Sequence, residues 1–221
     1  MNAHTQRLVL AGPAGALEAA LDLPRGPGAP AAPLATLVVC HPHPQGGGTL
    51  DNKVVQTVAR AGLQLGCRTL RFNFRGVGGS EGAWDEGRGE IEDALAAIAA
   101  ARALEGAAGQ PLWLAGFSFG GYVAASAAAR LDPAARPQRL ALVAPSTLKQ
   151  QVPPVPADTL VIHGESDDVV PLAATLDWAR PQALPVVVVP GVGHFFHGQL
   201  ALLKSLLLRA WSAPAASAGA P

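Results

Sequence analysis

Hydrophobic positions along the chain fall into short apolar runs, separated by longer stretches in which apolar residues recur at helical spacing. Most of the runs are continuously apolar, which is typical of strands buried on both faces of a sheet. One run is different, because Leu70, Phe72 and Phe74 alternate with polar residues. The predicted strands are Thr36–Cys40, Thr69–Phe74, Leu112–Phe117, Leu140–Val143, Thr159–Ile162 and Val186–Val189.

The stretches between these runs have the apolar spacing or the Ala-rich and Leu-rich composition of helices. The stretch that starts at Glu90 carries acidic residues in its first turn, where a helix dipole favours negative charge. Alternating strands and helices predict an α/β fold with a mostly parallel, twisted sheet and helices on both faces. The predicted helices are Asn52–Leu65, Glu90–Leu104, Gly120–Arg130, Leu172–Arg180 and Gln199–Trp211.

The two ends of the chain have patterns of their own. Residues 6–23 alternate loosely and turn at Gly12-Pro13, which predicts an antiparallel strand pair. The segment Arg25–Pro33 is rich in Pro, Gly and Ala and is predicted to be a loop. We find no internal repeat, so we expect a single domain over residues 1–211. The low-complexity segment 212–221 is predicted to be a disordered tail.

Charge and cysteine content narrow the class of protein. The chain has 16 Lys and Arg against 16 Asp and Glu, so no overall field attracts nucleic acid or an anionic membrane. The N-terminus has no basic start followed by a long apolar run, and no apolar stretch is long enough to cross a bilayer. We therefore expect a cytoplasmic protein. Cys40 and Cys67 lie in or beside predicted strands and are expected to be buried free thiols. The sequence makes no prediction of the oligomeric state.

The strongest chemical signal is the segment Gly116-Phe-Ser118-Phe-Gly120, between a predicted strand and an Ala-rich helix. This is the context of a G-x-S-x-G nucleophile elbow, in which the serine sits on a sharp, strained turn. Glycines at positions 116 and 120 remove side chains that would collide with the neighbouring strand and helix. The turn places the Phe119 amide at a helix N-terminus, where a free N–H group stabilises an oxyanion.

A serine hydroxyl needs an imidazole to take its proton and a carboxylate to orient that imidazole. After an elbow of this kind, the acid and then the histidine follow along the chain. Three carboxylates come just after the strand at 159–162, at Glu165, Asp167 and Asp168. His194 lies in a Gly-rich loop just past the next strand and is the predicted base. His197, the other downstream histidine, is expected near the start of the following helix.

The loop after the first buried strand, His-Pro-His-Pro-Gln-Gly-Gly-Gly-Thr, is expected to supply a second oxyanion donor. Its prolines have no N–H group, which leaves the amides of His43 and Gln45, and we favour His43. A metal site is an alternative for the histidines of this loop, because alternate residues of an extended chain share a face. Nothing in the spacing requires it. The histidines of that alternative are His41, His43, His194 and His197.

The segment from Arg71 to Ser80 carries the end of another strand into a Gly-rich loop. It lacks the helix entry of a dinucleotide-binding or phosphate-binding loop. We therefore predict a tight turn that shapes the wall of a pocket.

Five ordered motifs carry a family resemblance: HPHPQGGGTLDNKVVQ, RFNFRGVGGSEG, AGFSFGGYVA, HGESDDVVP and GHFFHG. Over residues 36–202 the chain resembles the small, lid-less α/β-hydrolases related to dienelactone hydrolases. The resemblance implies that Ser118 is the nucleophile and His194 the base, and it places the acid at the fifth residue of HGESDDVVP, Asp167. Dienelactone hydrolases proper have cysteine at the elbow, so their lactone substrate is not implied. The short segment between residues 144 and 159 predicts that there is no cap domain.

These observations predict a serine hydrolase that cleaves a small-molecule carboxylic ester through an acyl-enzyme, with no metal or organic cofactor. A thioesterase, an amidase or an acyltransferase using the same triad is the nearest alternative, because loops build the substrate pockets. A non-catalytic binding protein on a hydrolase scaffold is a second alternative, and the intact Ser, Asp and His argue against it. A metal-dependent hydrolase is the third.

Overall fold

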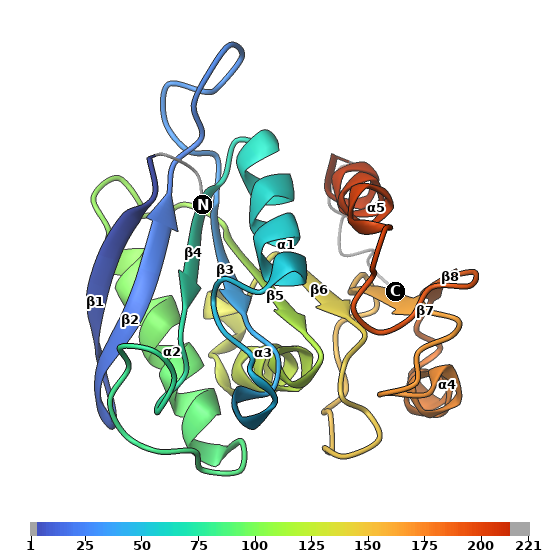
Figure 1. Cartoon of the computed structure of the whole chain (residues 1–221). Helices are drawn as coiled ribbons and strands as arrows, with labels where there is room; N and C mark the ends of the chain where they lie inside the picture. The colour runs from blue at the N-terminus through green and yellow to red at the C-terminus, as the bar shows by residue number, and fades with distance from the viewer. Residues whose placement is uncertain (1–3, 213–221) are drawn as a thin grey trace.

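The computed structural model describes residues 4–212 and is built on one eight-stranded sheet (Figure 1). The strand order is β1-β2-β4-β3-β5-β6-β7-β8. Strands β3 to β8 all pair in parallel with their neighbours among this group. At the other edge, β1 pairs antiparallel with β2, and β2 pairs antiparallel with β4. The strands are β1 (Gln6–Gly12), β2 (Gly15–Asp22), β3 (Thr36–Cys40), β4 (Arg68–Phe72), β5 (Leu112–Phe117), β6 (Arg139–Val143), β7 (Leu160–Gly164) and β8 (Val186–Val189).

Helices cover both faces of the sheet (Figure 1). α1 and α5 lie on one face, and α2, α3 and α4 lie on the other, so each face has its own apolar core. This arrangement confirms the predicted α/β class. The helices are α1 (Lys53–Gln64), α2 (Arg88–Ala103), α3 (Phe119–Arg130), α4 (Leu172–Ala179) and α5 (Leu200–Ser212), with short 3-10 helices η1 (Pro44–Gly46), η2 (Pro133–Ala135) and η3 (Arg180–Gln182).

The predicted elements and their order are confirmed, with small shifts at the ends. The N-terminal strand pair turns at residues 13–14, and the segment Arg25–Pro33 contains neither helix nor strand. Cys40 and Cys67 are buried free thiols, as expected. Ser212 is the last residue of α5 and of the described chain, so the rest of the predicted disordered tail lies outside the described residues.

Strand β4 shows that alternating polar residues do not always mark an exposed face. All five of its residues are buried, and it ends at Phe72 rather than at Phe74. The buried guanidinium of Arg71 is neutralised by Asp22 at 3.1 Å and also donates to the Leu50 carbonyl at 2.9 Å. A buried charge is tolerated when it is paired and hydrogen-bonded, so this strand lies inside the sheet despite its pattern.

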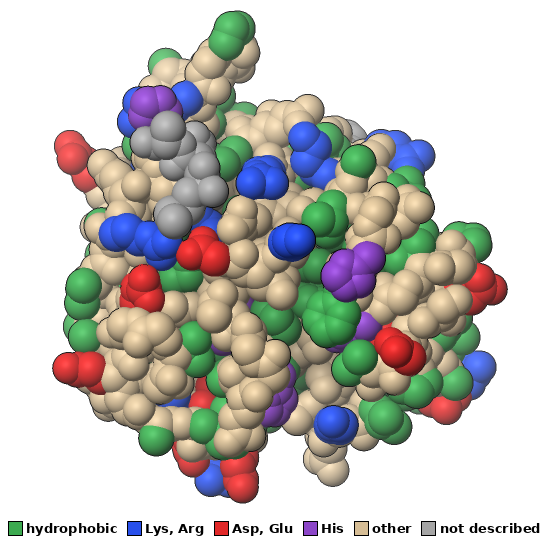
Figure 2. All heavy atoms as spheres, in the orientation of Figure 1, with side chains coloured by type: hydrophobic (Ala, Val, Ile, Leu, Met, Phe, Trp, Pro, Cys, Tyr) green, Lys and Arg blue, Asp and Glu red, His purple; other side chains and the backbone are tan. Residues whose placement is uncertain are grey.

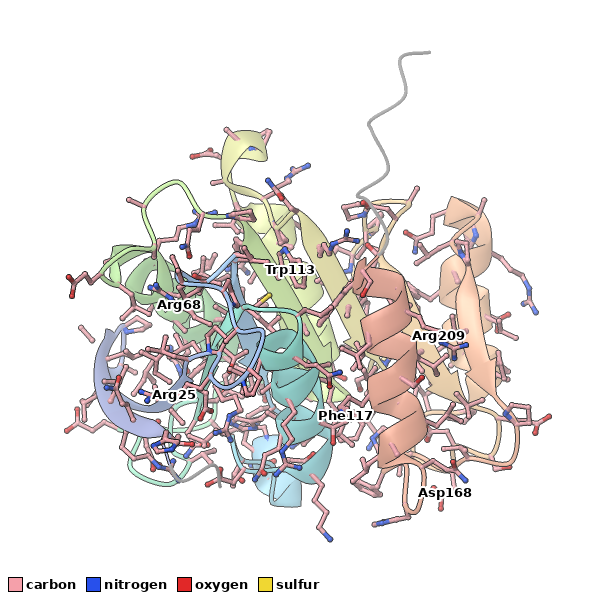
Figure 3. The ribbon with its side chains drawn as sticks, turned by 90° about the horizontal axis from the view of Figure 1, so that it is seen from above. Arg25, Arg68, Trp113, Phe117, Asp168 and Arg209 are labelled. Carbon is pink, nitrogen blue, oxygen red and sulfur yellow. The ribbon has the colours of Figure 1, made fainter. Side chains whose placement is uncertain are left out.

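The parallel strands all end at the same edge of the sheet, and the loops that follow them carry the candidate chemistry. Figure 3 shows Phe117 and Asp168 toward this edge, whereas Trp113 lies toward the opposite end of β5. Residues 144–159, which connect β6 to β7, contain only turns and extended chain, with no cap. Among residues 4–212, no helix is long and apolar enough to cross a membrane.

Candidate active site

Ser118 occupies the strained turn that the sequence predicts between β5 and α3. Its backbone has φ 57° and ψ −120°, a conformation that costs energy for any residue with a side chain. A Cβ atom at Gly116 would lie 2.0 Å from the Gly120 carbonyl oxygen, and one at Gly120 would lie 2.3 Å from the Cys40 carbonyl oxygen. The structure therefore confirms why both flanking positions are glycine: the strand, the helix and β3 pack backbone against backbone.

Three side chains from distant segments form one chain of hydrogen bonds at this turn. The Nε2 atom of His194 lies 2.9 Å from the Oγ of Ser118, and its Nδ1 lies 2.7 Å from Oδ2 of Asp167. Because a carboxylate only accepts, the imidazole proton is on Nδ1, and Nε2 is free to accept from the serine hydroxyl. All three residues are buried. The arrangement has the geometry of a Ser-His-Asp triad.

The carboxylate of Asp167 is held by its own loop. Its Oδ1 accepts from the amides of Val169 at 2.9 Å and Val170 at 2.8 Å. Burial by itself would raise the pKa of Asp167, but the hydrogen bonds from His194 and from these two amides outweigh burial and hold the pKa below its ordinary value. The group is therefore ionised and held in one orientation.

The other two candidate carboxylates, Glu165 and Asp168, are exposed. Glu165 nevertheless accepts from the Gly191 amide at 2.8 Å and so ties the loop that carries Asp167 to the loop that carries His194. This tie is a structural role that the sequence does not reveal, since the two residues are far apart along the chain.

His163 is the residue of this region that sequence reasoning left without a role. It is fully buried at the end of β7, with Nε2 2.8 Å from the Val170 carbonyl oxygen and 3.4 Å from Oδ2 of Asp167. Both neighbours are acceptors, so Nε2 carries the proton. Burial is the largest effect on the pKa of His163 and lowers it, which keeps the ring neutral. The only feature of the sequence that points to His163 is its position between a predicted strand and the loop that carries the three candidate carboxylates.

The loop after β3 packs directly behind the elbow. His41 is fully buried, and both of its ring nitrogens are occupied: Nδ1 donates to the Pro42 carbonyl at 2.7 Å, and Nε2 accepts from the Phe74 amide at 3.0 Å. Burial lowers the pKa of His41 to about 3. No group of three or more His, Cys, Asp or Glu side chains in residues 4–212 is placed to hold a metal ion. The four-histidine alternative is therefore not formed.

The two predicted oxyanion donors belong to segments that meet at the elbow. The rings of His43 and Phe119 lie 5.1 Å apart. The His43 carbonyl accepts from the amides of Gly46 and Gly48, which closes the loop into a tight turn. Figure 2 shows histidine and hydrophobic side chains beside one another in the middle of the face seen there. The assignment of these two amides to an oxyanion hole stays a prediction.

Comparison with known proteins gives the family. The family model for the alpha/beta hydrolase fold matches residues 36–156. With the elbow, the strand order and the hydrogen-bonded Ser, His and Asp already described, this match places the chain plainly: it belongs to the α/β-hydrolase family.

Solved structures give a closer likeness. An α/β serine hydrolase without a lid from Xanthomonas campestris is 40% identical, with a TM-score of 0.85 over 96% of this chain and 95% of the other. An α/β serine hydrolase homologue from Coxiella burnetii is 38% identical, with a TM-score of 0.78 over 92% and 96%. A dienelactone hydrolase from Anabaena variabilis is 17% identical, with a TM-score of 0.73 over 95% and 97%, and shares the fold. The chain is thus a homologue of lid-less α/β serine hydrolases, which confirms the predicted resemblance.

Proposed function

We propose that this protein is a carboxylesterase that uses Ser118 as nucleophile, His194 as general base and Asp167 as the orienting acid. The observation that carries the proposal is the unbroken hydrogen-bond chain from the Ser118 hydroxyl through His194 to Asp167. The strained backbone at Ser118 supports it, because strain of this kind persists where the surrounding structure enforces it and is frequent at active sites.

In the proposed reaction, Ser118 attacks the ester carbonyl carbon while Nε2 of His194 takes the hydroxyl proton. Asp167 stabilises the imidazolium and keeps its Nδ1 proton in place. The amides of Phe119 and His43 bind the oxyanion, and each such donor stabilises the transition state by roughly 3 kcal/mol. His194 then protonates the leaving alcohol. In the second half of the reaction, water attacks the acyl carbon while His194 takes its proton; the bond to the Ser118 oxygen then breaks, His194 returns the proton to that oxygen, and the carboxylic acid leaves. No step uses a metal or an organic cofactor.

A small-molecule ester is the proposed substrate class. The turn-only connection at residues 144–159 leaves the site without a cap, which suits small or extended esters better than deeply enclosed lipids. A thioesterase, an amidase or an acyltransferase would use the same triad, and a non-catalytic binding protein would not need one. We also propose a cytoplasmic location.

Labelling with a fluorophosphonate probe tests the nucleophile directly. We expect the wild-type protein to be labelled and the Ser118→Ala variant to remain unlabelled, with both folded by circular dichroism. Hydrolysis rates of matched esters, thioesters and amides would then rank the proposed activity against its alternatives. If wild type and Ser118→Ala are labelled equally, or if neither is labelled, the assignment of Ser118 is wrong.

A further inference from the structure

Three rings from three separate segments pack against one another beside the elbow. They belong to His43 in the loop after β3, Trp84 in the loop after β4, and Phe119 directly after Ser118. The ring centroids are 4.5 Å apart for His43 and Trp84, and 5.1 Å apart for His43 and Phe119 and for Trp84 and Phe119. We call these three residues the aromatic wall. Phe119 is buried, whereas His43 and Trp84 are half-buried, so part of each of these two residues is exposed to solvent.

The position of the aromatic wall relative to the triad assigns it to one half of an ester. In the sheet order, β3 and β4 lie on one side of β5, and β7 and β8 lie on the other. The loops after β7 and β8 carry Asp167 and His194. The leaving alcohol has to reach Nε2 of His194 to be protonated, so it lies on the β7–β8 side of Ser118. The acyl group is then directed to the β3–β4 side, toward the aromatic wall.

The wall also begins where the carbonyl would be held. His43 and Phe119 are the two residues whose amides are proposed to bind the oxyanion. With the carbonyl held there, the acyl carbons nearest the scissile bond would lie beside these two residues, and Trp84 contacts the rings of both.

The loop that carries Trp84 is held in place by two fully buried carboxylates of α2. Asp93 accepts from the Arg75 amide at 2.9 Å and from the Arg75 guanidinium at 2.7 Å. Glu90 accepts from the amides of Asp85 at 3.0 Å and Gly87 at 2.7 Å. Trp84 is thus fixed from both sides of its loop, and binding a ligand against it requires little ordering of the protein.

The imidazole ring of His43 is an uncharged aromatic ring in the wall. Burial lowers the pKa of His43, and the charge of Lys149 lowers it further against a smaller opposing effect of Glu90. The ring is therefore neutral at neutral pH. Aromatic groups pair favourably with such rings in offset or edge-to-face arrangements at centroid distances like those within the wall.

On the basis of the proposed function, we propose that the acyl group of the substrate is aromatic and that Trp84 is the residue that determines this specificity. A planar ring one or two bonds from the carbonyl would pack against the exposed parts of Trp84 and His43. A saturated ring of the same size buries similar area but lacks the aromatic pairing. The difference in kcat/KM between the two acyl groups therefore measures the effect of the aromatic wall.

The test compares p-nitrophenyl phenylacetate with p-nitrophenyl cyclohexylacetate, which share a leaving group. The kcat/KM for the phenylacetate is divided by that for the cyclohexylacetate. This ratio is then divided by the same ratio of hydroxide-catalysed hydrolysis rates, which corrects for the intrinsic reactivity of the two esters. We expect a corrected ratio of roughly two to ten in the wild-type protein, the factor for one aromatic pair. Trp84→Leu should bring the ratio to about one, and Trp84→Phe should retain most of it. Trp113→Leu is the matched control, because Trp113 lies toward the opposite end of β5 (Figure 3) and contacts Trp211.

Two results would overturn the inference while the proposed nucleophile stands. One is a corrected ratio near one in a wild-type protein that is labelled by the fluorophosphonate. The other is a preference that survives Trp84→Leu or disappears in Trp113→Leu. Failure of wild type to be labelled and to hydrolyse either ester would instead refute the proposed function, and the acyl specificity with it.

Discussion

At the scale of single residues, the carboxylate proposed as the acid is distinguished from its neighbour by its hydrogen bonds and not by its residue type. Asp167 and Asp168 are adjacent and chemically identical, yet only Asp167 meets His194, at 2.7 Å, while Asp168 is exposed. Asp167 accepts with both oxygens, one from two loop amides and the other from His194, so an amide side chain at this position would lose the charge and one of the two acceptors.

This difference gives a prediction with a built-in control. Asp167→Asn should lower kcat by roughly 10⁴-fold, because the asparagine no longer fixes the His194 tautomer that accepts the serine proton. Asp168→Asn should leave kcat nearly unchanged. Steady-state hydrolysis of an activated ester measures both. A large loss in Asp168→Asn with little loss in Asp167→Asn would show that the wrong carboxylate has been chosen.

At the scale of elements, the elbow depends on three backbone segments that pack more closely than any side chain between them would allow. β5 enters the turn, α3 leaves it, and the end of β3 packs against Gly120. The carbonyl groups that a Cβ would meet belong to strand and helix backbone, which has little freedom to move aside.

We therefore predict that Gly120→Ala lowers the free energy of unfolding by at least 1–3 kcal/mol, roughly the cost of overpacking a core, and disables Ser118. Gly46→Ala is the control, since its Cβ would have its nearest neighbour at 3.8 Å and its backbone does not need glycine. Urea unfolding followed by circular dichroism measures the difference. Equal stability of the Gly120→Ala and wild-type proteins would contradict the close packing described for the elbow.

At the scale of the whole molecule, one sheet edge gathers loops that are distant in sequence, and a buried histidine links two of them. His41, after β3, accepts from the Phe74 amide, after β4, and is fully buried. Its pKa is lowered to about 3, so the folded protein excludes a proton that the unfolded chain takes up below about pH 6.5.

The contribution of neutral His41 to the free energy of unfolding should therefore be fully present above about pH 6.5. It should decrease as the pH falls from there toward about 3. The slope from this one group reaches about 1.4 kcal/mol per pH unit. His41→Gln, which retains a donor and an acceptor but does not titrate, should flatten the dependence by about one proton. Urea unfolding at intervals between pH 7 and pH 4 provides the measurement. An unchanged slope in His41→Gln would mean that His41 is not the group that titrates.

Much of the fold was predictable because most of its strands are continuously apolar. The runs that became β3, β5 and β8 have the same bounds in the structure as in the prediction. Strand β4 was less regular, because the burial of Arg71 depends on a partner, Asp22, in another strand. The elbow was also predictable, because its glycines and serine are contiguous and their spacing follows from local geometry.

The sequence by itself determined the order of strands and helices, the elbow at Ser118 and a set of three candidate acids, since these follow from periodicity and short-range sterics; the family resemblance then favoured Asp167. Only the tertiary structure showed that Asp167 is the one of the three that meets His194, that His163 and Glu165 support the two loops, and that Trp84 faces His43 and Phe119. The physical reason is that hydrogen bonds and ring contacts require atoms a few ångströms apart. Packing of the sheet sets those distances between segments that local patterns leave independent.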